Sequence, residues 1–203
     1  HYSATLFLEE WRKKPSAATG FVAFAPVFAD TATGQIVSNA DALEQPLIAS
    51  ISRGDTVSRA FMSDGAEIAP LPGTEAEVKA IYDLFAKQNV FAKYYLHSEA
   101  NEAAVRDLRS YKYIHFATHG LTDEDHPDRS CLILAQTPDS THDNLLTGSE
   151  MYGLRLDADL VVLSACQTGK GQLRQGEGVI GLTRGLLYAG ARNLIVSQWN
   201  GND

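Results

Sequence analysis

The chain has 203 residues, 44% hydrophobic and 21% charged, which is enough to bury one sizeable core in a single domain. Its formal net charge of −8 argues against a surface that binds nucleic-acid phosphates and suits a basic partner. Two cysteines exclude a disulfide framework, and no apolar run reaches the roughly 18 residues of a membrane span. We therefore expect a cytoplasmic protein without membrane or direct nucleic-acid contacts.

The first 70 residues contain one clear strand signal. Residues 20–28 are apolar and rich in aromatic side chains, which is typical of a short buried strand. Residues 29–70 have no sustained period, so we expect a long loop there. The chain opens without methionine and stops just after its last expected strand. We therefore expect residues 1–203 to be a single domain that is a fragment lacking its C-terminal part, with residues 1–70 its least certain part.

Helix and strand signals alternate from residue 71 onwards. Thr74 and Glu77 have the spacing of a capping box that would open an amphipathic helix over 75–88. Thr147 and Glu150 have the same spacing ahead of a short helix. Strands are expected over 91–96, 113–118, 131–135, 160–163 and 193–199, and further helices over 99–109 and 179–189, the last one ended by Gly190.

This alternation predicts an α/β fold with a mostly parallel sheet and helices on both faces. Residues 160–163 are continuously apolar, as a strand covered on both faces must be. His119 and Cys166 each follow an apolar strand, and ligand and active sites gather at the carboxyl ends of parallel strands. If the two strands are neighbours, the imidazole can activate the thiol. The spacing alone supports a structural histidine and a core cysteine equally well.

Several sequence motifs together resemble the CHAT domain, a bacterial caspase-like cysteine peptidase module that is often fused to TPR repeats. These motifs are LPGTEAEV (71–78), HFATHG (115–120), LVVLSACQTG (160–169), GEGVIGLTRGLLYAGARN (176–193) and IVSQW (195–199). The resemblance implies a caspase-like fold, with His119 as proton shuttle and Cys166 as nucleophile. The backbone N–H groups of Gly120 and Cys166 are the candidates for the oxyanion hole.

The resemblance also implies how such a protein works. We expect no metal or organic cofactor, and a protein or peptide substrate that is cut in a regulated bacterial pathway. A TPR or sensor region, fused or associated, would release the activity. The rival interpretation is a catalytically silent caspase-like scaffold that only binds a partner.

The family's relatives suggest the specificity. Caspases carry a glutamine at the position of Ser164 and an arginine at that of Leu71, and both bind aspartate, so we do not expect cleavage after aspartate. Residues 198–203 resemble a stretch of the separases, which cut after arginine, although Asn200 replaces an aspartate there.

Cleavage after a basic residue is therefore expected. Asp203 is the candidate for the carboxylate at the floor of the subsite, and Trp199 could form a flat wall for the apolar stem of the bound side chain. Ser164 is the third candidate substrate-binding residue, and Glu177 is the next candidate carboxylate after Asp203.

Three further features of the sequence suggest other kinds of site or a structural role. Residues 176–181 match a dinucleotide-binding fingerprint, but they do not follow a strand directly, so their glycines are expected to allow a helix to approach the sheet closely. His115 and His119, with Asp123 or His126, could suggest a zinc site, but His115 is expected to be a core residue or one that supports a residue of the site. Cys131 lies in an apolar run and is expected to be a small core residue.

Overall fold

The computed structural model describes residues 18–28, 70–123, 125–135, 137, 143–167 and 177–197. Of residues 166, 167 and 177–179 only the backbone is described. The strands are β1 (Phe21–Ala25), β2 (Ala92–Leu96), β3 (Tyr113–Leu121), β4 (Cys131–Ile133), β5 (Leu145–Thr147), β6 (Leu160–Gln167) and β7 (Leu194–Val196). The helices are α4 (Pro72–Lys87), α5 (Glu102–Arg106), α6 (Gly148–Met151) and α7 (Glu177–Ala189), with 3₁₀ turns η1 (His97–Glu99) and η2 (Pro127–Arg129).

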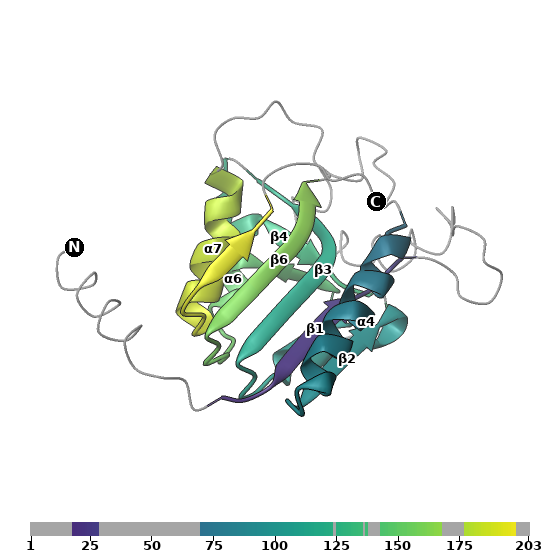
Figure 1. Ribbon diagram of the computed structural model, residues 1–203. Coiled ribbons are helices and arrows are strands. Elements are labelled where there is room, and N and C mark those ends of the chain that lie inside the picture. Colours follow the sequence, from purple (N-terminus) through teal and green to yellow (C-terminus); the bar gives the residue numbers. More distant parts are fainter. Residues whose placement is uncertain are drawn as a thin grey trace.

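The seven strands form one mostly parallel sheet, which confirms the predicted α/β class. Five parallel strands lie in the order β2, β1, β3, β6, β7. β4 pairs antiparallel with the end of β3, beyond the part that pairs with β1, and β5 pairs antiparallel with β4. Helix α4 lies across one face of the sheet, while α6 and α7 lie on the opposite face (Figure 1).

Each face of the sheet packs into its own apolar cluster. On the α7 face, Val161 and Leu163 of β6 pack with Leu182 and Leu186 of α7. On the α4 face, Val78 packs with residues of β1 and with Ala117 of β3. The alternation of side chains along each strand divides the apolar residues between these two clusters.

Strand β6 is covered more fully on the α7 face than on the α4 face by the described residues. Val161 and Leu163 are buried, whereas Leu160 and Val162 are half-buried, and Ile195 of the neighbouring β7 is exposed. The described residues therefore cover residues 160–163 fully on the α7 face and partly on the α4 face. The physical reason is that α4 packs mainly against β1 and β2 (Figure 1).

Helix α4 begins earlier than predicted and without a capping box. Pro72 stands in the first turn, where its fixed φ fits a helix and its missing N–H is no loss. The N-cap is Leu71, and the Thr74 hydroxyl donates to the Leu71 carbonyl from inside the helix at 2.6 Å. Glu77 therefore lies well inside the helix, where its carboxylate is not used as a cap.

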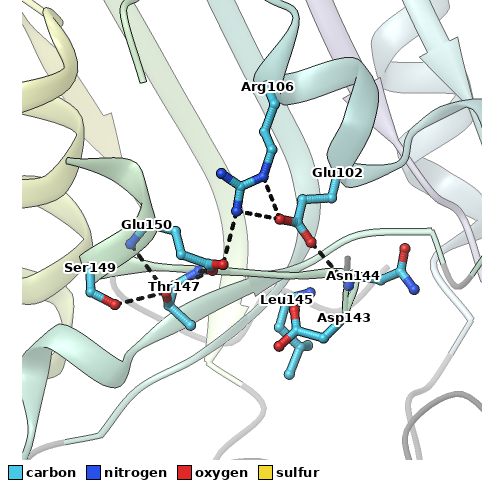
Figure 2. A network of polar contacts seen from close by, with 8 residues as sticks. All are labelled: Glu102, Arg106, Asp143, Asn144, Leu145, Thr147, Ser149 and Glu150. Carbon is cyan, nitrogen blue, oxygen red and sulfur yellow. Dashed lines mark hydrogen bonds and ion pairs between the residues drawn. The ribbon is translucent and has the colours of Figure 1, made fainter. Parts of the chain in front are cut away.

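A polar network ties α5 to α6 and to the residues ahead of β5 (Figure 2). Glu102 is 1% exposed and accepts hydrogen bonds from Arg106 Nε at 2.7 Å and from the backbone N–H of Asn144 at 3.1 Å. Arg106 Nη2 also donates to Glu150 at 2.9 Å. Glu150 closes the predicted capping box with Thr147, which is confirmed.

Glycines let α7 approach its neighbours closely, but the neighbours are η2 and α6 rather than the sheet. A Cβ at Gly181 would lie 1.6 Å from the Pro127 carbonyl oxygen, and one at Gly185 would lie 2.8 Å from that of Gly148. Gly190 has φ of +115° just after α7, which confirms it as the residue that ends the helix.

Candidate active site

The register of the sheet brings the two predicted dyad positions side by side. β3 and β6 pair in parallel from Tyr113 opposite Leu160 to Gly120 opposite Gln167, and within this ladder His119 is the Cα partner of Cys166. Both residues lie inside the paired strands instead of just after them, because the ladder between β3 and β6 continues to the pair of Gly120 and Gln167. Gly120, a candidate for the oxyanion hole, occupies the rung after the dyad.

His119 is buried and its ring packs against an aromatic ring. The residue is 2% exposed. The centroid of its ring lies 5.2 Å from that of the Phe28 ring, at an interplanar angle of 40°. Phe28 follows β1, where the backbone of Val27 and Phe28 has positive φ and the Val27 carbonyl accepts from the N–H of Leu71. The packed aromatic ring restricts the orientations that the imidazole can adopt.

A second polar group lies on the same face of the sheet as His119. His115 is four positions earlier on β3, so strand alternation places it on that face. Its imidazole is 6% exposed, and Nε2 lies 3.0 Å from Oε1 of Glu77, which reaches it from α4. The sequence interpretation took Glu77 for a cap and so missed this pair. The signal that could have found it is the helical spacing of Glu77 and Ile81, which packs against the sheet.

Ser164 joins this group from β6. Position 164 is the Cα partner of Ala117, between the rungs of His115 and His119. The His115 imidazole, and to a smaller extent the Ser164 hydroxyl, hold the pKa of the Glu77 carboxyl below its ordinary value against the effect of burial. The Glu77 carboxylate thus links α4 to β3 through His115, and Ser164 lies on the neighbouring strand.

The remaining predicted positions fall into two groups. Trp199, Asp203 and the side chain of Glu177 lie outside the described residues. Cys131 is buried in a small apolar cluster, which confirms it as a core residue.

His115 was expected to be a core residue, and it is buried. Within the described part of the chain, no three His, Cys, Asp or Glu residues gather where they could hold a metal ion. None of the helices described is long and apolar enough to cross a membrane.

Comparisons with known proteins bear on this arrangement. A stretch of 55 residues, 27% of the chain, is 42% identical to mouse tetratricopeptide repeat protein 28. The matched part is 2% of that protein's length. The model of one protein family, the CHAT domain, matches residues 14–203, which include both strands of the dyad and α4. The chain therefore belongs to the CHAT domain family.

Proposed function

We propose that the chain is a cysteine endopeptidase that uses His119 and Cys166 as a dyad and cuts a partner protein after a basic residue. The observation that supports this most directly is the parallel register that makes His119 the partner of Cys166. Membership of a family with caspase-like peptidases supports the reaction class.

The proposed reaction uses the dyad, the backbone N–H groups of Gly120 and Cys166, and water. The His119 imidazole takes the proton from the Cys166 thiol, and the thiolate attacks the carbonyl carbon of the scissile bond. A C–S bond forms, and the N–H groups of Gly120 and Cys166 stabilise the oxyanion. His119 then protonates the leaving amine as the C–N bond breaks, and water hydrolyses the thioester with His119 as general base.

The basic specificity rests on Ser164, Trp199 and Asp203, together with the acidic balance of the chain. A carboxylate can bind a guanidinium through two hydrogen bonds, and a tryptophan ring can cover its apolar stem. The similarity to a tetratricopeptide repeat protein supports a fused or associated TPR region that controls cleavage. We place this activity in the cytoplasm of a bacterium, in a regulated pathway.

The dyad is tested with a thiol-reactive peptide probe that carries arginine next to its reactive group, on wild type and on Cys166→Ala, His119→Ala and Cys131→Ala variants. We expect labelling and peptide cleavage to disappear in Cys166→Ala, to fall strongly in His119→Ala, and to persist in Cys131→Ala because Cys131 is buried. Labelling that survives Cys166→Ala would contradict the dyad. A protein that is not labelled at all but still binds its partner would be a catalytically silent scaffold.

A further inference from the structure

The polar group beside the dyad contains an ionised carboxylate that substrate could reach. Glu77 keeps 37% of its side chain exposed, whereas His115, its partner, is 6% exposed. Solvent therefore reaches the carboxylate from the side of α4, and the histidine lies beneath it.

The partners of Glu77 leave its negative charge available. The other ion-paired glutamates described here contact a lysine or an arginine: Glu75 pairs with Lys79, and Glu102 and Glu150 pair with Arg106. Within the described residues, Glu77 forms an ion pair with a histidine, and no lysine or arginine pairs with it. A histidine carries a full charge only when it is protonated, so the carboxylate can still take a cation.

The distance along β6 fits the length of a basic side chain. Positions 164 and 166 are two residues apart on the same strand and on the same face, about 6.6 Å at the rise of a β-strand. An extended arginine or lysine whose carbonyl lies at Cys166, and whose side chain follows this face, brings its cationic end near Ser164. On this face Glu77 pairs with His115, whose rung lies two residues before that of Ser164. The Ser164 hydroxyl also helps to lower the pKa of the Glu77 carboxyl.

We propose that Glu77 is an acidic group of the subsite that binds the basic side chain before the scissile bond. This inference rests on the proposed peptidase function and names a specificity residue for it. His115 acts as a positioning residue that holds the carboxylate against the sheet, and Ser164 contributes a hydroxyl to the same cation. The apolar stem would lie along β6 between positions 166 and 164.

The test compares two peptides that differ in charge alone, one with arginine and one with its neutral isostere citrulline before the scissile bond. For Glu77→Gln we expect kcat/KM for the arginine peptide to fall about 10- to 100-fold, because a charge-assisted pair is lost, while the citrulline peptide changes less than about twofold. Glu75→Gln is the matched control, since Glu75 lies on the same helix but pairs with Lys79, and it should change neither rate. Glu77→Asp keeps the charge and should retain most of the preference for arginine.

An equal loss for both peptides in Glu77→Gln would mean that Glu77 is structural, and no loss for either would place the acidic group elsewhere. Either result overturns this inference and leaves the dyad intact. A wild type that prefers aspartate or leucine overturns the basic subsite as well.

Binding of the uncleaved peptides to Cys166→Ala separates the two proposals. If arginine binds more tightly than citrulline, and Glu77→Gln removes the difference, Glu77 is confirmed even where the wild type cuts nothing. If the two peptides bind equally well, the Glu77 inference is wrong whatever the activity.

Discussion

At the scale of single residues, Glu102 is the carboxylate most removed from water in the described part of the chain. Burial raises its pKa above the ordinary value, and the hydrogen bonds from Arg106 act against this. The carboxylate is kept because it satisfies both the Arg106 guanidinium and the backbone N–H of Asn144 (Figure 2). Without it, the buried N–H of Asn144 and the half-buried Arg106 guanidinium would each lose an acceptor.

We predict that Glu102→Ala lowers the free energy of unfolding by about 2 kcal/mol, because the buried N–H of Asn144 loses its acceptor and Arg106 loses one of its two carboxylate partners. Arg106 keeps Glu150 as a partner, which limits the loss. Urea denaturation followed by circular dichroism measures the change. Glu99→Ala, an exposed glutamate in η1, is the control and should change stability by less than about 0.5 kcal/mol. Equal stability of the two variants would show that the network does not stabilise the fold.

The lowered pKa of Glu77 predicts how the stability of the fold depends on pH. The sign is opposite to that for an acid whose pKa is raised by burial. Its folded-state pKa is lowered, first by His115, so its contribution to stability is present above the ordinary value of 4.5 and is lost as pH falls through the lowered pKa. The melting temperature of wild type should therefore exceed that of Glu77→Gln at pH 6, and the difference should shrink steadily towards pH 3. A difference that stays constant over this range would mean that the Glu77 charge does not contribute.

At the scale of elements, most helices and strands follow from local pattern, and the errors have tertiary causes. The capping-box spacing at Thr147 and Glu150 was correct, but the same spacing at Thr74 and Glu77 was not. Pro72 can start a helix earlier, and Glu77 finds a better partner in His115, which lies far away in sequence. Strand β5, only Leu145–Thr147, is too short to show a period, and its pairing with β4 defines it.

The close contact between α7 and η2 predicts that a larger residue at position 181 destabilises the fold. Gly181 has no room for a Cβ because the Pro127 carbonyl would lie 1.6 Å away, and both are backbone positions that cannot rotate aside. We predict that Gly181→Ala destabilises the protein by about 3 kcal/mol or displaces η2, although alanine favours a helix over glycine. Thermal unfolding measures the loss.

Arg184→Ala is the control for Gly181→Ala, since Arg184 is exposed on the same helix and should be nearly neutral. Because η2 follows the strand of His119 and α7 follows that of Cys166, displacement of η2 should also reduce cleavage by the proposed dyad. A Gly181→Ala protein as stable as wild type would contradict the close contact.

At the scale of the whole molecule, the mostly parallel sheet was predictable from the alternation of strands and helices, but its register was not. The sequence could place His119 and Cys166 near strand ends, and only the pairing of β3 with β6 makes them partners. The antiparallel β4 and β5 were also beyond prediction, because a parallel and an antiparallel short strand have the same local pattern. The Glu77–His115 contact depends on where α4 crosses the sheet, which no local spacing encodes.

The net charge of −8 leads to a prediction about rate and salt. A protein with an excess of carboxylates attracts a cationic peptide before contact, and salt screens this attraction over a Debye length of about 10 Å at 0.1 M. For the proposed basic specificity, kcat/KM for the arginine peptide should fall several-fold between 0.02 M and 0.5 M sodium chloride, mainly through a rise in KM. The citrulline peptide lacks the charge and should respond much less.

The same salt series on Glu77→Gln separates the field of the whole molecule from the local pair. This variant still carries most of the negative charge, so its remaining cleavage of the arginine peptide should keep a salt dependence, although a shallower one. If salt acts equally on both peptides in wild type, the dependence reflects the stability or the dyad instead of the attraction of a cation. A flat profile for the arginine peptide would mean that the acidic charge lies too far from the site to draw the substrate in.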